Sequence, residues 1–568
     1  MSRTESGAAV GRTEPEAAMS RTESGLSVGR DDPDLSVGRR GAAVTGGCAD
    51  PSLPGAEPFP PYRRPLTIRT PRGATAVMGG LRSLRPSPFL VFGTLFWVLM
   101  SAAAWRVPIC CDFGQHAAVV ERLKADLLDP AHPMAAAPGD GSAYYSPYAV
   151  LQGLFAKVTG LAGWQVVKLS GPLNLLVLLT GLNRFVKALT PSRWAPLLAL
   201  ACMVLLWGTK MAWWSGYLGL MSMTGHLPFP STFAIGLAFW AWALTARLAR
   251  TSGSLLPYAG LGALCGLILL IHPISSVAAV IGVVSFLLGR VRRSQVRRMA
   301  PRWGLAALTA AAVVLLWPYY SVLSLVGDSS VDGIHRQLYE AMPERFWLAI
   351  IGLPALALRW WRDRRDPLVL MFVLGCLTIA YGWVSGHYTY GRIMGLTLIP
   401  LQFALAVELT QARPWTWGRR VLAAACGAGL ALSFFSVQAG AVVPRAWDPV
   451  GFDQPPRWPS YDWAAERIAP GEVVLTNSYR ATRSLPGYGP NLLAPAWPDA
   501  SMAETERARR SKAVARYLAP GSTPAERAAV VRQFGVRWLL LSPDQRVPRE
   551  ARVVAWGPRT GEVLARVD

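Results

Sequence analysis

The sequence predicts an α-helical polytopic membrane protein with a small α/β domain at its C-terminus. Apolar residues make up 52% of the 568 residues and charged residues only 16%, which is below the share that water-soluble domains carry. Long apolar runs alternate with short basic clusters, a pattern typical of membrane proteins with basic cytoplasmic loops. From residue 444 onward the runs give way to shorter helix and strand patterns.

Residues 1–87 differ in composition from the rest of the chain. The motif MSRTESG occurs twice there, and so does SVGR. The segment is rich in Gly, Pro, Ser, Arg and acidic residues and lacks apolar periodicity, so it cannot bury enough surface to fold. We therefore expect a disordered cytoplasmic tail. The alternative is that the true start of the protein is Met78 and that the gene start has been placed too early.

The membrane domain is predicted to cover residues 88–443. A crossing helix needs about 20 mostly apolar residues, and about eleven segments come near this length. They are 89–107, 165–183, 194–210, 230–248, 255–271, 274–289, 303–323, 346–360, 367–385, 393–410 and 421–442. For 145–161, which is shorter and more polar, we expect an interfacial or re-entrant helix.

The charges of the loops predict the orientation in the membrane. Every second loop is basic, with clusters at 82–85, 184–193, 247–250, 290–302, 359–365 and 413–420. Basic loops stay in the cytoplasm, so we expect the N-terminus inside a cytoplasmic membrane. The long loop 108–145 and the α/β domain, residues 444–568, are then outside.

The net charge of +23 does not indicate nucleic-acid binding, because the basic residues fall in short loops between apolar runs. The sequence contains no G-x-x-x-x-G-K-[ST] motif for nucleotide phosphates and no G-x-S-x-G motif of a serine hydrolase. The chemistry must therefore come from other residues.

The sharpest local motif is CCDFGQHAAVVERL, which directly follows the first predicted span. Asp112 and His116 are four residues apart and share a face of the helix that the pattern predicts. A carboxylate at a membrane surface loses part of its hydration, which tunes its basicity and its affinity for metals. Asp112 is thus a candidate catalytic residue; the alternative is that it only caps the helix.

Two further groups of candidates fall in segments that are predicted to be external. Tyr144 and Tyr145, in AYYSPYAVLQGL, form either a stacking wall for a sugar or an ordinary aromatic belt. His272, in LIHPISS, is a polar residue at membrane depth, where such residues tend to face a cavity. The alternative is that Pro273 simply makes a hairpin there.

The motif GHYTYGRIMG carries His387, Tyr390 and Arg392 at the external start of a predicted span. An arginine there runs against the charge bias, and guanidinium groups bind phosphate well, so we expect Arg392 to contact a lipid phosphate. Asp332 lies in the loop GDSSVDGIHRQLYEAMPER. That loop is either a solvated amphipathic helix or a gate over the site that carries a metal-binding carboxylate.

The histidines share one side of the predicted map. All six lie in external loops or near external ends of spans: His116, His132, His226, His272, His335 and His387. This distribution favours a polar cavity that opens to the outside. The central prediction is that Asp112, His272 and Arg392 meet in that cavity.

Together these features resemble the GT-C superfamily of membrane glycosyltransferases, which includes protein mannosyltransferases, aminoarabinose transferases and catalytic oligosaccharyltransferase subunits. CCDFGQHAAVVERL matches the acidic start of the family's long first external loop. YYSPYAVLQGLFAKVTGL looks like the aromatic segment that closes that loop, and VVRQFGVRWLLLSP looks like part of an external C-terminal domain. The resemblance covers about residues 85–568 and rests mostly on architecture.

The resemblance implies transfer of a sugar from a polyprenyl-phosphate donor to a glycan, lipid or protein acceptor outside the cytoplasm. In that picture Asp112 is the general base that activates the acceptor hydroxyl. Arg392, with His387, would neutralise the leaving lipid phosphate. His272 or His116 would position or coordinate the substrate.

The acid of the first loop departs from the pattern of this superfamily. Many of these enzymes carry two adjacent acids there, whereas Asp112 stands between Cys111 and Phe113. A divalent metal is a candidate cofactor, with Asp112 and Asp332 as candidate ligands.

Two other functions stay open. A transporter or flippase of an envelope lipid or glycan is one, although no inverted repeat with matching broken helices is visible. A non-catalytic envelope-assembly protein on the same fold is the other, and the single acid of the first loop favours it.

Overall fold

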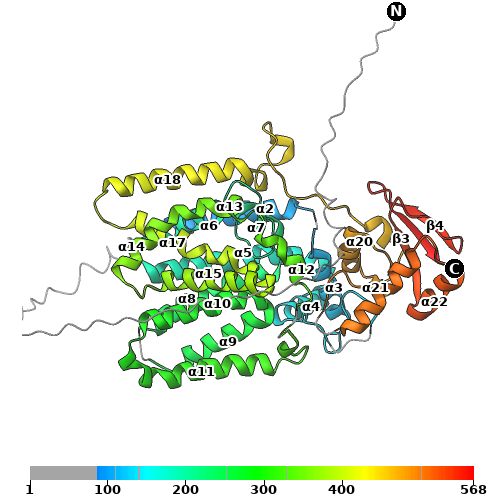
Figure 1. Ribbon diagram of the computed structural model, residues 1–568, viewed down its shortest axis with the longest axis horizontal. Coiled ribbons are helices and arrows are strands. Elements are labelled where there is room, and N and C mark those ends of the chain that lie inside the picture. The colour runs from blue at the N-terminus through cyan, green and yellow to red at the C-terminus, as the bar shows by residue number, and fades with distance from the viewer. Residues whose placement is uncertain are drawn as a thin grey trace, which may run out of the picture. The chain divides into compact units, whose positions relative to one another are not determined.

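The computed structural model describes residues 86–567, apart from 109, 138–140, 251–252, 326, 328 and 500–501. The tail 1–87 lies almost wholly outside the described residues, so its predicted disorder stays a prediction. The described part is mostly helical and has one small sheet near its C-terminus (Figure 1).

Seven helices of the described part are long and apolar enough to cross a membrane, or eight if one bent pair counts as a span. Five are single helices: α2 (Pro88–Arg106), α5 (Gly163–Leu189), α8 (Pro230–Leu248), α10 (Pro273–Arg290) and α15 (Pro367–Ser385). The sixth is the run Tyr388–Thr410, which consists of η6 (Tyr388–Ile393), α16 (Met394–Thr397) and α17 (Ile399–Thr410). The seventh is the run Trp417–Ala441, which begins with α18 (Trp417–Ser433). The bent pair, Asp332–Tyr339 and Met342–Arg362, turns by 73° and ends with α14 (Leu353–Arg362). The chain is therefore an integral membrane protein.

Three further helices coincide with predicted spans: α6 (Ala195–Leu205), α9 (Leu256–Ile271) and α11 (Val296–Leu315). Each of the predicted spans thus overlaps a helix. Helices α6 and α9 have 11 and 16 residues, which is shorter than a bilayer core requires of a straight helix. The exact number of crossings therefore remains a prediction.

Several of these helices begin at a short capping side chain followed by proline. The hydroxyl of Ser87 accepts from the backbone N–H of Leu90 at the start of α2. The carboxylate of Asp366 does the same for Leu368 at the start of α15. Proline fits the first helical turn because its missing N–H would have no intrahelical partner there. The local sequence thus sets where these apolar runs become helical.

Small residues let the central helices pack closely. A Cβ on Gly181 of α5 would lie 2.5 Å from the carbonyl oxygen of Gly236 of α8. Such contacts are typical of helices that associate in lipid. Trp242 of α8 is fully buried, and its Nε1 donates to the carbonyl of Ala279 in α10 at 2.9 Å. Its indole lies directly against Gly282 of α10.

We expect Gly282→Ala to lower the melting temperature of the purified protein. The new Cβ would overlap Nε1 of Trp242, and the hydrogen bond to Ala279 holds the indole in place. Overpacking of this kind typically costs about 1–3 kcal/mol. The control is Gly260→Ala in α9, where a Cβ meets nothing within 4 Å. Equal melting temperatures for the two variants would show that the contact is not tight.

The C-terminal part contains a five-stranded sheet of order β2-β1-β3-β5-β4. Strand β1 (Val473–Leu475) pairs in parallel with β2 (Asn491–Leu492) and with β3 (Val536–Leu541), whereas β5 (Val563–Val567) pairs antiparallel with β3 and with β4 (Ala551–Trp556). The accompanying helices are α19 (Asp462–Ala465), α20 (Tyr479–Ser484), α21 (Glu504–Leu518) and α22 (Pro524–Phe534). The sequence predicted this combination of short helices and strands.

The loop 108–145 adds to the free edge of this sheet, which the sequence did not predict. The backbone N–H of Leu492 donates to the carbonyl of Met134 at 2.9 Å, and Ala136 donates back to Leu492 at 3.3 Å. A parallel bridge between Ala135 and Leu492 results. The loop 108–145 and the C-terminal domain therefore form one folded layer.

Helix α3 (Phe113–Ala125) lies against the same domain (Figure 1). The Arg122 guanidinium donates to the carbonyl of Gly489 at 3.2 Å and to Oδ1 of Asn491 at 2.6 Å. A Cβ on Gly114 would overlap the carbonyl oxygen of Arg483 in α20, so this approach requires glycine. Helix α4 (Pro147–Thr159), the predicted interfacial helix, packs on α3.

Loops that the charge pattern assigns to the cytoplasm also contact one another. Nη1 of Arg290, at the end of α10, lies 3.7 Å from Oδ2 of Asp363, which follows α14. Nε of Arg302 donates to the carbonyl of Gly253 at 3.5 Å. These contacts agree with the prediction that the basic loops lie on one and the same side of the protein. The orientation relative to the membrane remains a prediction.

Candidate functional site

A cavity of about 300 Å³ brings together five of the predicted site residues. Asp112 and His116 come from the loop that follows α2 and the start of α3, and Tyr144 precedes α4. His272 lies at the α9–α10 turn, and Arg392 in η6. The structure thus places Asp112, His272 and Arg392 in one cavity, as the central prediction requires.

Asp112 holds the N-cap position of α3, but its side chain makes no capping hydrogen bond in the described structure. Its backbone carbonyl accepts from the N–H groups of Gln115 and His116, both at 3.1 Å. The preceding Cys111 has a φ of 58°, a left-handed conformation that is uncommon outside glycine. The predicted alternative, a purely capping aspartate, therefore does not explain the carboxylate, which lines the cavity instead.

The pKa of Asp112 is raised above its usual value. Burial is the largest cause, and the Cys111 thiol adds to it, whereas the guanidinium groups of Arg392 and Arg483 act in the opposite direction. A carboxylate with a raised pKa is a stronger base near neutral pH. The two arginines approach Asp112 from different parts of the chain, since Arg483 lies in α20 of the C-terminal domain.

Arg483 is a residue that sequence reasoning missed. Its guanidinium lies 3.7 Å from the ring centre of Tyr479 and 4.1 Å from that of Trp497, so it is held between two aromatic side chains. Nη1 donates to the carbonyl of Tyr479 at 2.9 Å, and Nε is buried without a hydrogen-bond partner among the described residues. No local motif marks it, because Asp112, on whose pKa it acts, lies more than three hundred positions away in the chain.

His116 is a neutral side chain at neutral pH. Burial lowers its pKa to about 4. Its ring lies edge-on to Phe229 at 5.0 Å and to Tyr144 at 6.2 Å. Burial also raises the pKa of Tyr144, and the negative charges of Asp112 and Asp499 add to this. His116 and Tyr144 therefore supply neutral hydrogen-bonding groups beside the carboxylate.

His272 and Arg392 lie side by side in the cavity. Nδ1 of His272 lies 2.9 Å from Oγ of Ser275 and 3.2 Å from the backbone nitrogen of the same residue. Nη2 of Arg392 lies 3.4 Å from Nε2 of His272, and because a guanidinium only donates, Nε2 is the acceptor of this hydrogen bond. Nε of Arg392 is buried and has no hydrogen-bond partner in the described part of the chain. A buried guanidinium with an unused N–H suits an anionic oxygen that accepts from it.

Three predicted site residues do not line the cavity in the described structure. Nδ1 of His387 lies 3.1 Å from Oδ2 of Asp332. The hydroxyl of Tyr145 donates to the backbone carbonyl of Ala131. Tyr390 packs against Tyr381 with ring centres 5.7 Å apart. Each of the three is engaged by another neighbour, and the binding roles predicted for them stay predictions.

The loop that carries Asp332 is amphipathic: one face is buried, and the other, with Gly333, Arg336 and Glu340, is exposed. Asp332 and His335 are buried. Oδ1 of Asp332 accepts from the backbone N–H of Thr389 at 2.9 Å, and Nδ1 of His335 lies 2.8 Å from Oγ1 of Thr389. Thr389 lines the cavity three residues before Arg392. The loop therefore supports the segment that presents the arginine.

A second carboxylate, Asp499 of the C-terminal domain, also lines the cavity and was not predicted. The hydroxyl of Ser142 donates to its Oδ2 at 2.5 Å and accepts from the backbone N–H of Tyr144 at 3.2 Å. His132 accepts two backbone N–H groups on Nδ1, so its proton is on Nε2, 3.6 Å from Oδ2 of Asp499. This buried network ties the first loop, and with it Tyr144, to the C-terminal domain.

The described residues do not fit the predicted metal centre. No three His, Cys, Asp or Glu side chains among them lie close enough together to hold an ion. Asp112 lines the cavity, whereas both carboxylate oxygens of Asp332 are engaged by His387 and Thr389. The two candidate ligands therefore do not form one centre.

Comparisons with known proteins connect this architecture to solved structures. No protein-family model matches the chain, and no curated protein matches its sequence. Arabinofuranosyltransferase AftD from Mycobacteria matches with a TM-score of 0.51 and 16% identity over 84% of this chain. ArnT from Cupriavidus metallidurans, in a crystal structure bound to undecaprenyl phosphate, matches with a TM-score of 0.50 and 14% identity over 86% of this chain and 98% of its own.

Both of these proteins are GT-C glycosyltransferases, and the chain has a GT-C-like fold. The resemblance that the sequence predicted is confirmed at the level of the fold. The chain spans 40% of the length of AftD. At such low identities the likeness is one of fold alone.

Proposed function

We propose that this protein is a membrane glycosyltransferase that moves a sugar from a polyprenyl-phosphate donor to an acceptor outside the cytoplasm. The observation that carries the proposal is the shared cavity of Asp112, His272 and Arg392. A buried base next to an anion-binding guanidinium is the set of groups that such a transfer needs. The GT-C-like fold supports the proposal because AftD and ArnT are glycosyltransferases.

In the reaction, the hydroxyl oxygen of the acceptor attacks the anomeric carbon of the donor sugar. The bond between that carbon and the phosphate oxygen breaks, and the polyprenyl phosphate leaves with the electron pair. Asp112 accepts the proton of the attacking hydroxyl. The Arg392 guanidinium, which lies beside His272, stabilises the negative charge that develops on the phosphate.

The carrier and the acceptor are bound at different parts of the cavity. ArnT in its crystal structure holds undecaprenyl phosphate, which supports a polyprenyl phosphate as the carrier of this chain. Arg392 lies near the end of η6 and His272 at the α9–α10 turn, next to apolar helices that can contact the prenyl chain. Tyr144 and Tyr148 line the cavity beside Asp112 and offer aromatic faces to a sugar.

The sidedness of the reaction follows from the loop charges. With the basic loops inside, the cavity, the first loop and the C-terminal sheet face the space outside the cytoplasmic membrane. Cysteine labelling of exposed positions such as Ser460 and Arg292 with a membrane-impermeant reagent tests this arrangement. A cysteine at 460 should react in intact cells and one at 292 only after the membrane is opened.

A transfer assay on the purified protein tests the proposed function. Polyprenyl-phosphate sugars with a radiolabel in the sugar are supplied in vesicles together with envelope glycan and lipid extracts as acceptors. Transfer of label to an acceptor, with release of polyprenyl phosphate, is the expected result. Movement of intact labelled lipid between leaflets without transfer would instead indicate a transporter, and no change in either would indicate a non-catalytic protein.

We expect Arg483→Gln to move the acidic limb of the pH–rate profile to higher pH. The base must be ionised, so the rate falls as the pH drops through the pKa of Asp112. The Arg483 guanidinium lowers that pKa, and its loss raises the pKa further. Arg546→Gln, at an exposed position of the same domain, should leave the limb in place. If the acidic limbs of the two pH–rate profiles coincide, Arg483 does not act on the base.

A further inference from the structure

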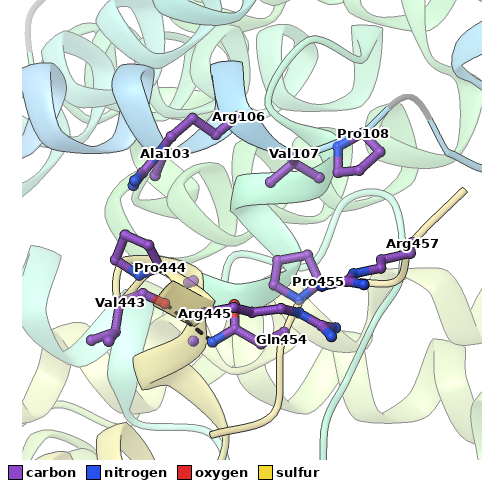
Figure 2. Close-up of a pocket in the computed structure, with 12 residues that line it drawn as sticks. Ala103, Arg106, Val107, Pro108, Val443, Pro444, Arg445, Gln454, Pro455 and Arg457 are labelled. Atoms are coloured by element: carbon purple, nitrogen blue, oxygen red, sulfur yellow. Dashed lines mark hydrogen bonds between the residues drawn. The ribbon is translucent and has the colours of Figure 1, made fainter. Parts of the chain in front are cut away.

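A second pocket, of about 240 Å³, lies between the end of α2 and the segment that follows α18 (Figure 2). Arg106 and Pro108 belong to its α2 side, and Arg445, Gln454 and Arg457 to the other side. Three exposed arginines from distant parts of the sequence therefore border one small cavity. The proposed transferase chemistry does not use any of them.

The three positive charges are not balanced by carboxylates in the described structure. Among the described residues, no hydrogen bond or ion pair joins the guanidinium group of Arg106, Arg445 or Arg457 to a carboxylate. The nearby Asp448 has its carboxylate occupied by the backbone N–H groups of residues 450–452, at 2.7–3.1 Å. Like charges that line one cavity repel each other unless an anion joins them.

The segment that presents Arg445 and Arg457 is held in a defined shape. Nε2 of Gln454 donates to the carbonyl of Val443 at 3.1 Å, as Figure 2 shows, and so closes the loop between the two arginines. Asp448 organises the turn within the loop through its backbone contacts. A Cβ on Gly440 would overlap the carbonyl oxygen of Asp453, so the loop packs tightly against the chain that follows α18. The backbone of the loop that carries Arg445 is therefore held by contacts within the protein.

The pocket adjoins the ends of apolar helices. Arg106 is the last residue of α2, and the apolar run that begins with α18 ends at Ala441, directly before the pocket segment. Both boundaries are on the side of the Asp112 loop. At the end of an apolar helix arginines can reach the polar heads of lipids, and guanidinium groups bind phosphate oxygens through paired N–H donors.

We infer that the pocket of Arg106, Arg445 and Arg457 binds a phosphate group at the membrane surface. The phosphate comes either from the headgroup of an anionic phospholipid or from a soluble phosphate. The pocket is separate from the Asp112 cavity, since the residues that line the two do not overlap. The inference therefore stands or falls independently of the proposed transferase function.

Thermal unfolding of the full-length protein in detergent tests the inference. The probes are phosphatidylglycerol, the zwitterionic phosphatidylcholine and inorganic phosphate, each titrated against the wild type and the triple variant Arg106→Ala/Arg445→Ala/Arg457→Ala. We expect phosphatidylglycerol to raise the melting temperature of the wild type. Loss of charged hydrogen bonds should weaken binding in the triple variant by about tenfold or more.

The single variant Arg546→Ala is the matched control, because it removes an exposed arginine of the C-terminal domain outside the pocket. It should keep the full phosphatidylglycerol effect. An arginine-dependent effect of inorganic phosphate alone would identify a soluble phosphate as the source. The inference is overturned if neither anionic probe stabilises the wild type, or if the triple variant responds as the control does.

Discussion

Asp112→Asn should reduce sugar transfer by about a hundredfold to ten-thousandfold, the range that a positioned general base contributes. The amide keeps the shape of the side chain but cannot accept the proton of the acceptor hydroxyl. The side chain makes no capping hydrogen bond to α3 in the described structure, so the variant should fold normally. Turnover with saturating donor and acceptor, measured beside the melting temperature, separates the loss of the base from unfolding.

Asp129→Asn is the matched control for the base. Asp129 is an exposed acid of the same external loop and does not line the cavity. Its variant should retain the wild-type rate. If Asp112→Asn also keeps the wild-type rate, another residue accepts the proton, and the alternative of a non-catalytic protein on this fold gains support.

Arg392→Ala should weaken both donor binding and turnover. The guanidinium bonds the phosphate in the ground state, and it stabilises the larger charge of the leaving phosphate. Loss of such a donor from a buried site costs about a hundredfold to a thousandfold in rate. Arg392→Lys keeps the charge but loses the planar arrangement of donors, so it should retain part of the activity. The KM for the donor and kcat, measured for each variant, distinguish the two effects.

Arg413→Ala removes an exposed arginine that follows α17, in a loop that the charge pattern assigns to the cytoplasm. This control variant should leave kcat and the KM for the donor unchanged. An Arg392→Ala variant with normal kcat and a normal KM for the donor would contradict the assignment of the phosphate to this arginine. The donor phosphate would then have to bind elsewhere in the protein.

The sequence predicted those candidate site residues whose signal lies within a short stretch of the chain. Asp112 and His116 stand one helical turn apart, and a basic residue against the charge bias indicated Arg392. The position of His272 between two apolar runs indicated a polar cavity at membrane depth. These signals lie within short stretches of sequence, so they can be interpreted without knowledge of the tertiary fold.

Residues that depend on distant contacts could not be predicted. Asp499 and Arg483 reach the first loop because that loop pairs with β2 and because Gly114 lets α3 approach α20. No periodicity or motif encodes such a contact. Conversely, His387 looked like a phosphate ligand from its place beside Arg392, but Asp332 engages it from another loop.

In the membrane part, too, features with a local signal could be predicted and features that depend on distant contacts could not. Hydropathy located a helix at each of the predicted spans, because an apolar run in lipid must satisfy its own backbone hydrogen bonds. It did not determine how many cross the membrane, since α6 and α9 are short and the pair before α15 is bent. Tilt, bending and pairing of helices depend on side-chain packing such as that of Trp242 on Gly282.

A structure of the protein with a bound polyprenyl phosphate tests the central claim most directly. The proposed function predicts the phosphate in the Asp112 cavity, with its oxygens within hydrogen-bond reach of the Arg392 guanidinium and with the prenyl chain passing between apolar helices. The carboxylate of Asp112 should face the side of the phosphate where the sugar would be attached. An empty Asp112 cavity at a saturating concentration of the lipid would contradict the claim.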